Sequence, residues 1–336
     1  MIDEIISDDL EKINAAVSKD DFAGKKALVT GGAGFIGSWL CDALTSFDAE
    51  VTVVDDLSTG RTQNIDHLKR IAEFKFVKSD ICDFESLEKF DIIFHMAGHA
   101  SPDEYQTHPI ETLQTSAKGS FNMAELARKN DATLLFASTS EVYGDAEVIP
   151  TPETYWGKVN PVGPRSCYDE GKRFAEALLV AYRKQYGLDV RVPRIFNTYG
   201  PRLREDGLYG RAMSRFISQA LTNQPVTVYG NGKQTRSFCY IIDNIIGLLL
   251  LTACSKAKGE TVNIGNSREV SILELAEKVK EITKSKSTIE FQPLPKDDPK
   301  RRCPHTGKIE SLIGWKANVN FEDGLKRTIT WFSART

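Results

Sequence analysis

The sequence predicts an α/β protein built on a doubly wound parallel sheet. Three observations support this prediction: a glycine-rich turn at 31–37 that joins an apolar strand to a helix, further apolar strands that alternate with helical segments, and an acidic residue, Asp55, that ends the second strand. Strands that alternate with helices are typical of a parallel sheet covered by helices on both faces.

Composition narrows the function classes. The 336 residues suffice for one large or two modest domains, and a net charge of −3 provides no general attraction for nucleic acid. The six cysteines are scattered and lack a C-x-x-C pair, which indicates reduced thiols in a cytoplasmic protein. The longest apolar run, 245–254, is too short to span a membrane, and the acidic N-terminus lacks the apolar segment of a secretory signal.

The chain begins with a predicted helical extension over 1–24. Residues 3–18 carry apolar side chains at helical spacing, as at Ile6, Leu10 and Ile13. We expect this helix to pack outside the main domain and to take no part in chemistry.

The glycine turn follows the short strand Lys26–Thr30 and predicts a dinucleotide site of the Rossmann type. Side chains at its glycines would block both a pyrophosphate and the packing of the helix on the strand, and the helix N-terminus offers free N–H groups to phosphates. The candidate cofactor-binding residues here are Gly31, Gly34, Phe35, Ile36 and Gly37.

The second strand, Val51–Val54, ends in Asp55. A carboxylate at this place accepts hydrogen bonds from the adenosine ribose, which favours NAD over NADP. Arg61 instead favours NADP, because an arginine there can reach a 2′-phosphate.

Strands are also predicted at 74–77, 92–95 and 133–137, with a long helix at 109–129. From their positions at strand ends, we expect Asp80 and Ile81 to contact the adenine. Met96 and Ala97 are expected beneath the nicotinamide ribose.

His95 and His99 are four residues apart, a spacing that suits metal ligands on a helix. These two residues follow a strand and have no third ligand nearby in the sequence, so structural roles are favoured and no metal site is predicted.

Tyr168 and Lys172 are candidate catalytic residues. Side chains four apart lie on one face of a helix, and an ammonium beside a phenol favours the phenolate, with each pKa unit of lowering equal to roughly 1.4 kcal/mol. Such a phenol can take a proton from an alcohol while a hydride leaves the same carbon. The commoner origin of this spacing is a half-buried tyrosine and a solvated lysine, and the neighbouring motifs are what favour catalysis.

The strand 133–137 leads into Ser138, Thr139, Ser140 and Glu141 at the sheet edge where α/β proteins bind ligands. Hydroxyls in this run can orient a sugar hydroxyl, and Glu141 can move a second proton. The alternative for Ser138 and Thr139 is that they cap a helix or brace a turn.

Together, Thr30–Gly37, Ser138–Gly144 and Tyr168–Lys172 resemble the extended short-chain dehydrogenase/reductase family of NAD-dependent nucleotide-sugar epimerases and dehydratases. The stretch 137–200, with ASTSEVYGD, YWGKVNPVGPRSCYDEGKRFAEAL and RIFNTYGPR, is similar to the branch that decarboxylates UDP-glucuronate. The resemblance implies NAD-dependent conversion of UDP-glucuronate to UDP-xylose through a 4-keto sugar, with the hydride recycled internally.

Two residues distinguish the branches of this family. The related 4,6-dehydratases have an aspartate where this chain has Ser140, and many 4-epimerases have a small or hydroxyl residue where it has Glu141. The alternatives are therefore a nucleotide-sugar 4-epimerase acting on UDP-glucuronate or UDP-glucose, less favoured a 4,6-dehydratase, and a non-catalytic sensor with the same fold.

The resemblance also implies roles in the second half of the chain. Asn197 and Arg236 would hold the diphosphate, Tyr229 would lie near the uracil, and Arg302 would meet the sugar carboxylate. A surface salt bridge is the alternative for Arg236, and a solvated charged loop for Arg302.

This chain departs from the family at three places. Ser116 replaces an asparagine, Cys303 replaces a lysine, and the loop 203–211 is longer than in animal members.

The resemblance further implies a Rossmann-type sheet with a smaller interleaved C-terminal α/β substrate lobe. Residues 25–195 would mainly form the NAD-binding domain and 196–336 mainly the nucleotide-sugar lobe. We also expect a homodimer built from the helices at 109–129 and 167–187, a UDP-sugar as the partner, and no nucleic acid or membrane.

Overall fold

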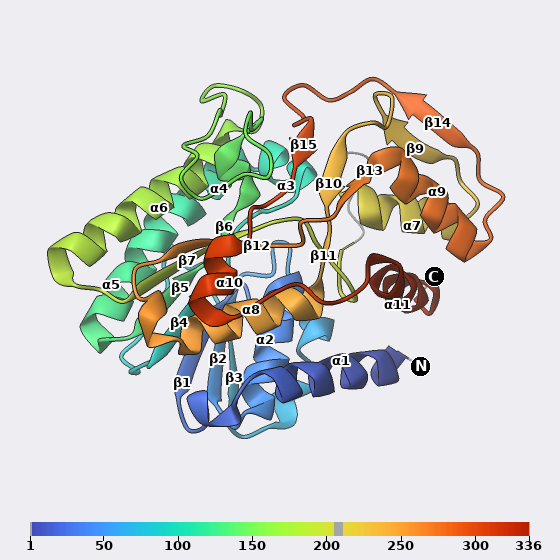
Figure 1. Cartoon of the computed structure of the whole chain (residues 1–336). Coiled ribbons are helices and arrows are strands. Elements are labelled where there is room, and N and C mark those ends of the chain that lie inside the picture. The colour runs from blue at the N-terminus through green and yellow to red at the C-terminus, as the bar shows by residue number, and fades with distance from the viewer. Residues whose placement is uncertain (1, 205–210, 336) are drawn as a thin grey trace.

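A parallel eight-stranded sheet forms the centre of the computed structural model, which describes residues 2–204 and 211–335 (Figure 1). Its order is β12 (Thr261–Ile264), β7 (Val190–Ile195), β5 (Thr133–Phe136), β4 (Ile92–His95), β1 (Lys26–Thr30), β2 (Glu50–Asp55) and β3 (Phe74–Lys78). The short β6 (Ser138–Thr139) pairs with β7. Along the chain, β2 and β3 add to one side of β1, and β4, β5 and β7 add to its other side. Sheets of this kind bind ligands at such a switch point. The predicted doubly wound sheet is confirmed.

The central strands are apolar because both of their faces are covered. In β1 and β2 every residue after the first is buried. The helices of the first half are α2 (Phe35–Ser46), α3 (Pro102–Thr107), α4 (Pro109–Gln114), α5 (Ser120–Asn130) and α6 (Ser166–Tyr186). No helix in the described ranges is long and apolar enough to cross a membrane.

The segment 109–129 is not the single helix that its sequence predicts. A π-helical turn, Thr115–Gly119, separates α4 from α5. Close packing explains this turn: a Cβ on Gly119 would lie 2.4 Å from Cδ1 of Ile81, and one on Gly171 of α6 would lie 2.9 Å from Oγ of Ser116. Ser116, one of the departures from the family pattern, therefore packs directly against α6.

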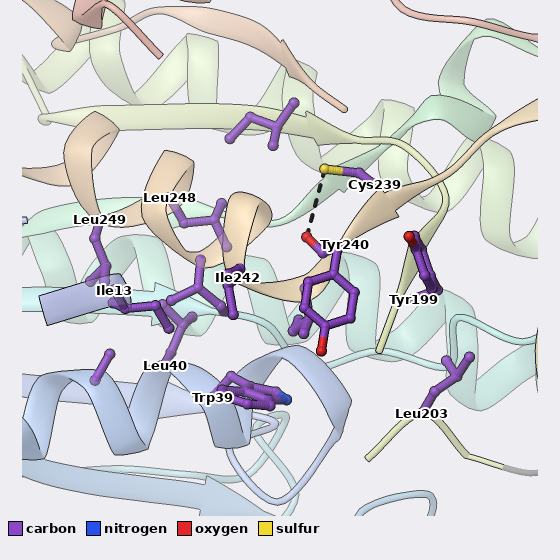
Figure 2. Packing of buried hydrophobic residues seen from close by; sticks show 14 of the residues in the cluster. Ile13, Trp39, Leu40, Tyr199, Leu203, Cys239, Tyr240, Ile242, Leu248 and Leu249 are labelled. Carbon is purple, nitrogen blue, oxygen red and sulfur yellow. Dashed lines mark hydrogen bonds between the residues drawn. The ribbon is translucent and has the colours of Figure 1, made fainter. Parts of the chain in front are cut away.

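The N-terminal helix α1 (Ile2–Ala16) joins the two halves of the molecule. It packs on α2, on α8 (Ile241–Ala253) and on α11 (Phe321–Ser333). Figure 2 shows Ile13 meeting Leu40 of α2 beside Leu249 of α8. The helix lies outside the large sheet, and its Ile13 belongs to the main buried cluster.

A buried polar contact fixes α1 in place. Asp9, which is fully buried, accepts a hydrogen bond from the Tyr240 hydroxyl at 2.7 Å. Its other carboxylate oxygen lies 2.9 Å from a guanidinium nitrogen of Arg327 on α11. The first helix is thus tied to the last one.

The second half builds a smaller lobe and returns once to the large sheet, through β12. Its helices are α7 (Ala212–Leu221), α9 (Ile272–Thr283) and α10 (Gly307–Ile313). Its strand pairs are β9 (Val226–Tyr229) with β14 (Ile289–Gln292), and β8 (Thr198–Tyr199) with β11 (Cys239–Tyr240). A third sheet places β10 (Thr235–Ser237) between β13 (Glu269–Ser271) and β15 (Arg301–Arg302). Most of the loop singled out at 203–211, residues 205–210, lies outside the described residues.

Candidate active site

A cleft of about 660 Å³ opens at the carboxyl edge of the large sheet and extends to the smaller lobe. Its volume is that of a site for small molecules. All the residues predicted above to bind a cofactor, to bind a substrate or to catalyse lie along its walls. The sequence motifs, which are spread over more than 270 positions from Gly31 to Arg302, therefore converge on one site.

The glycine turn forms one end of the cleft. Gly31 has a φ of +66°, and its N–H donates to the carbonyl of Val54 at 2.8 Å. A Cβ on Gly37 would lie 2.2 Å from the carbonyl oxygen of Gly31, so the first turn of α2 can approach β1 only without a side chain there. The helix N-terminus thus faces the cleft with its N–H groups, as a pyrophosphate requires.

Asp55 braces this turn as well as lining the cleft. Its carboxylate accepts the N–H groups of Ala33 and Leu57, each at 2.9 Å, and burial raises its pKa. A Cβ on Gly60 would come within 2.6 Å of the same carboxylate. Arg61, considered above as a ligand for a 2′-phosphate, does not line the cleft among the described residues.

The floor of this end comes from the strands next to the glycine turn. The N–H groups of Met96 and Ala97 both donate to the Thr30 hydroxyl, at 3.1 and 3.2 Å. Asp80 and Ile81 line the same cleft. A glycine cradle, a buried carboxylate and a helix N-terminus together fit a dinucleotide.

Tyr168 and Lys172 occupy successive turns at the start of α6, and both side chains are buried. The Lys172 ammonium donates to the Ala137 carbonyl at 2.8 Å and lies 4.6 Å from the ring centroid of Phe136. Its distance to the ring centroid of Tyr168 is 6.0 Å. Burial lowers the pKa of Lys172 to about 8.

The Tyr168 phenol is hydrogen-bonded to the Thr139 side chain. Burial raises the pKa of Tyr168 to about 12, and the bond to Thr139 only partly offsets this effect. The expectation that Lys172 lowers this pKa is wrong for this structure, because the ammonium points at the Ala137 carbonyl and the phenol is desolvated.

Glu141 lies in the short 3₁₀ turn Ser140–Tyr143, which Thr139 caps by accepting the Glu141 N–H at 3.3 Å. Its carboxylate is paired with both Arg302 and Arg165. Burial raises the pKa of Glu141, but the two guanidiniums outweigh burial and hold the pKa below its ordinary value. Glu141 is therefore a carboxylate at neutral pH.

The serines on either side of Thr139 differ in their roles. The Ser138 hydroxyl donates to Glu176 at 2.5 Å, and Glu176 is paired with Arg194 at 2.6 Å. Ser138 therefore braces α6 against β7, which was the structural alternative. Ser140 is buried and lines the cleft.

The far end of the cleft gathers the predicted substrate residues. Arg236 on β10 is paired with Asp298 at 3.0 Å, and the β10–β15 register places it directly beside Arg302. Asn197 has a buried side-chain oxygen without a hydrogen-bond partner among the described residues, as expected of a group that awaits a ligand. The ring of Tyr229, at the end of β9, lies 4.6 Å from the Arg215 guanidinium.

The two histidines have structural contacts. Nδ1 of His95 lies 3.0 Å from the Thr30 hydroxyl and Nε2 lies 3.1 Å from Ser120, and burial lowers the pKa of His95 to about 3. Nδ1 of His99 lies 3.1 Å from the Thr112 hydroxyl. Within residues 2–204 and 211–335, no group of three potential metal-ligating side chains occurs.

Three residues of the site were not predicted: Arg165, Asp298 and Tyr105. Arg165 carried a signal, because it lies three residues before Tyr168 and so shares its helical face. Asp298 and Tyr105 carried none, since their partners Arg236 and Tyr168 are 62 and 63 positions away.

Comparison with known proteins gives the family of this chain. A family model described as GDP-mannose 4,6 dehydratase matches residues 28–328. UDP-glucuronic acid decarboxylase 1 of Danio rerio is 48% identical over 309 residues, covering 92% of this chain and 73% of the relative. UDP-glucuronic acid decarboxylase 1 of Arabidopsis thaliana is 45% identical over 315 residues, covering 93% and 71%.

Solved structures show the same fold. The UDP-glucuronic acid 4-epimerase of Bacillus cereus in complex with UDP-glucuronic acid and NAD has a TM-score of 0.84 at 28% identity, covering 93% of this chain and 100% of that one. The UDP-glucose 4-epimerase of Thermotoga maritima with UDP-glucose has a TM-score of 0.84 at 32% identity, covering 92% and 99%. The chain therefore belongs to the family that the GDP-mannose 4,6 dehydratase model describes, within the extended short-chain dehydrogenases/reductases, and its curated relatives are UDP-glucuronic acid decarboxylases.

Proposed function

We propose that this protein converts UDP-glucuronate to UDP-xylose and CO2 with NAD as a retained cofactor. One observation carries the proposal: the Glu141 carboxylate, paired with Arg302 and Arg165, lies in the same cleft as the Tyr168–Lys172 pair. The relatives named UDP-glucuronic acid decarboxylase support the choice of reaction.

The cofactor end of the cleft suits NAD. The glycine turn and the N-terminus of α2 would hold the pyrophosphate, and Asp55 would accept the ribose hydroxyls. NAD, when bound, supplies the acceptor for the hydride from the sugar C4 and gives that hydride back at the end of the cycle.

Tyr168 removes the proton of the sugar 4-hydroxyl, while Thr139 holds both oxygens in line. Burial keeps this phenol protonated in the empty chain. It acts as the base only as the phenolate, after its own proton has left to solvent, and the positive charge of a bound nicotinamide would favour that form. The positive N-terminus of α6, where Tyr168 lies in the first turn, favours the negative charge that develops on the phenol.

The 4-keto sugar is a β-keto acid and loses its C6 carboxylate. The C5–C6 bond breaks, CO2 leaves, and the electron pair moves to the C4 oxygen as an enolate, which hydroxyl donors at that oxygen stabilise. A proton from solvent then bonds to C5, and we propose that the Glu141 carboxylate, with Ser140, orients the water that passes it on. The proton that Tyr168 took returns to the C4 oxygen when the ketone is reduced.

The other end of the cleft would bind UDP-glucuronate through four residues. Arginine forms bidentate pairs with phosphate and carboxylate groups, which suits Arg236 for the diphosphate and Arg302 for the sugar carboxylate. Asn197 would add a contact to the diphosphate, and Tyr229 would lie against the uracil.

A second candidate is 4-epimerisation, which is supported by the structural neighbours described above, because both are 4-epimerases. The test is to incubate the purified protein with UDP-glucuronate and to follow CO2 and UDP-xylose together. Release of both supports the proposal, and UDP-galacturonate without CO2 would show an epimerase. A 4-keto-6-deoxy product from another nucleotide sugar would show a dehydratase, and absence of any turnover would favour a sensor.

We also propose a homodimer and a reducing compartment, the cytoplasm. Apolar side chains on α4, α5 and α6 are exposed, among them Leu113, Phe121 and Phe174, and such a patch supports a helical interface with a second copy. All six cysteines are free thiols, which supports the cytoplasmic assignment.

A further inference from the structure

Two buried guanidiniums share one carboxylate in the cleft, although they are held in different ways. Arg165 precedes α6 and Arg302 lies on β15, and both contact Oε2 of Glu141. Their side chains are 12% and 8% exposed, so neither charge is screened by bulk water. An arrangement of this kind is stable only while every charge keeps a partner.

Arg302 retains unused donor capacity. Its Nε is buried and has no hydrogen-bond partner among the described residues. A guanidinium has five N–H groups in a planar fork, so Arg302 can accept a second carboxylate without rebuilding its surroundings. This is the role that the proposed function gives it with the sugar.

Arg165 is anchored more firmly. Its Nε lies 3.8 Å from Oδ2 of Asp169, one helical turn along α6. Its guanidinium lies 5.9 Å from the ring centroid of Tyr105, which stacks on Tyr168. The position of Arg165 is thus set by the same helical turn that carries the phenol.

The sugar carboxylate and Glu141 compete for Arg302. Two carboxylates beside one guanidinium repel each other, and a buried carboxylate that loses its cation is strongly disfavoured. Arg165 is the cation that Glu141 keeps when the substrate takes Arg302. The side chain then stays beside the reaction centre instead of turning away.

We propose that Arg165, braced by Asp169, is a positioning residue that keeps the Glu141 carboxylate aimed at C5 once the substrate carboxylate engages Arg302. This inference rests on the proposed decarboxylation. It adds two residues to which the sequence analysis gave no role, Asp169 on α6 and Arg165 directly before it.

Asp169 matches this role by its environment. It is 5% exposed, and its Oδ1 has no hydrogen-bond partner among the described residues. Burial, followed by the charge of Glu141, raises the pKa of Asp169 to about 7. The charged and titratable groups that face it are Glu141, Arg165, Arg302, Glu170 and Tyr105.

The experiment compares three variants of the NAD-loaded full chain with UDP-glucuronate in deuterated water. These are Arg165→Met, Arg165→Lys and the control Arg183→Met, at an exposed arginine of α6 that donates a hydrogen bond to the Gly259 carbonyl. The measurements are kcat, KM and, by NMR, the configuration of the deuterium at C5 of UDP-xylose.

We expect Arg165→Met to lower kcat by about 100-fold, the effect of misplacing one reacting group, with KM changed by less than about threefold. Deuterium at C5 should then lose its single configuration, since a displaced Glu141 no longer directs the proton to one face. Arg165→Lys should restore part of both, and Arg183→Met should match the wild type. A loss of stability alone would lower the amount of active protein but would leave the C5 configuration unchanged.

An Arg165→Met variant that keeps its kcat and one C5 configuration would overturn the inference. If that variant does not fold, Asp169→Asn is the deciding variant. The inference requires that it lose less kcat than is expected for Arg165→Met and that its kcat depend less on pH near pH 7. A pH profile like that of the wild type rejects the inference. A wild-type protein that releases no CO2 would reject the proposed function and the inference with it. An active wild type with unaltered variants rejects the inference alone.

Discussion

Tyr105 lies flat against Tyr168, with the two ring centroids 5.1 Å apart and the ring planes 4° from parallel. Both side chains are buried, and Tyr105 comes from α3 whereas Tyr168 comes from α6. The catalytic ring is therefore held in orientation by packing as well as by its hydrogen bond to Thr139.

This stack predicts different outcomes for two substitutions of Tyr105. Tyr105→Leu removes the flat partner and should lower kcat by about tenfold, because the phenol is no longer fixed against the sugar hydroxyl. Tyr105→Phe keeps the stack and removes a buried hydroxyl that has no partner among the described residues, so it should retain kcat and raise the free energy of unfolding by about 1 kcal/mol. Steady-state kinetics and urea denaturation measure both; equal kinetics for the two variants would contradict the role of the stack.

Glu141→Gln should stop the reaction after oxidation. The neutral amide cannot pass a proton from solvent to C5 as the carboxylate does, and loss of a proton-transferring side chain lowers rates by about 100- to 10,000-fold. Mass spectrometry of the quenched reaction should show a 4-keto sugar in place of UDP-xylose. Tyr168→Phe is the matched control, since it blocks the earlier step and should give no 4-keto sugar; full activity of Glu141→Gln would disprove its assigned role.

Lys172 should destabilise the folded protein at neutral pH. Burial lowers its pKa to about 8, whereas an unfolded lysine titrates near 10.4. Below pH 8, burying the charged ammonium lowers the free energy of unfolding by its full amount. This loss becomes smaller between pH 8 and about 10.4, where the unfolded chain binds more protons than the folded one, and it is absent at higher pH.

Lys172→Met should therefore abolish turnover but raise the free energy of unfolding by about 2 kcal/mol at pH 7, after allowance for the lost hydrogen bond. Urea denaturation at pH 7 and pH 9.5 measures the gain, which should shrink at the higher pH. Lys256→Met, an exposed lysine, is the control and should change neither value. A variant that is less stable at pH 7 would show that the contacts of Lys172 outweigh its burial.

Asp298→Asn should tighten the binding of UDP. Asp298 is paired with Arg236 at 3.0 Å, and a diphosphate must compete with that carboxylate for the same guanidinium. Loss of the competing charge should lower the Kd for UDP by about fivefold, equal to roughly 1 kcal/mol. Calorimetry at two salt concentrations measures this Kd. A higher Kd for UDP would mean that Asp298 orients Arg236 instead of competing with the diphosphate for it.

Asp9→Ala should loosen the attachment of α1. The substitution leaves the Tyr240 hydroxyl and the Arg327 guanidinium without their buried partner, and we expect a loss of about 3 kcal/mol in the free energy of unfolding. Denaturation measures the loss, and Glu11→Ala, at an exposed position of α1, is the control. Asp9, Tyr240 and Arg327 do not line the cleft, so KM should stay within about twofold of the wild type.

Sequence patterns predicted the sheet well because its strands are fully buried. The strands Lys26–Thr30 and Ile92–His95 begin and end as predicted, since continuous apolar runs bounded by polar or glycine residues leave little choice of length. The break at Thr115–Gly119 could not be predicted in this way. It depends on how closely Gly119 approaches Ile81, a contact across 38 positions.

The site shows the same division. The residues that motifs define by type and spacing, such as the glycine turn and the Tyr168–Lys172 pair, all line the cleft. The pKa of Tyr168 was predicted in the wrong direction because it depends on burial, which the spacing of two letters does not contain. The pairing of Arg165 with Glu141 was missed because a sequence motif gives the spacing of residues along the chain. It does not say which carboxylate an arginine contacts in the fold.

The parallel pairing of β10 with β15 has a consequence for ligand choice. Arg236 and Arg302 are directly opposite each other on the two paired strands. The backbone therefore sets the spacing between the two cations, because neighbouring strands lie about 4.8 Å apart. In the proposed function, these two arginines would bind two negative groups of one ligand, the diphosphate and the sugar carboxylate, at a spacing that the strands fix. A sugar nucleotide with an uncharged hexose would match only one end, and the fold would discriminate against it by charge and length without any need for a narrower cleft.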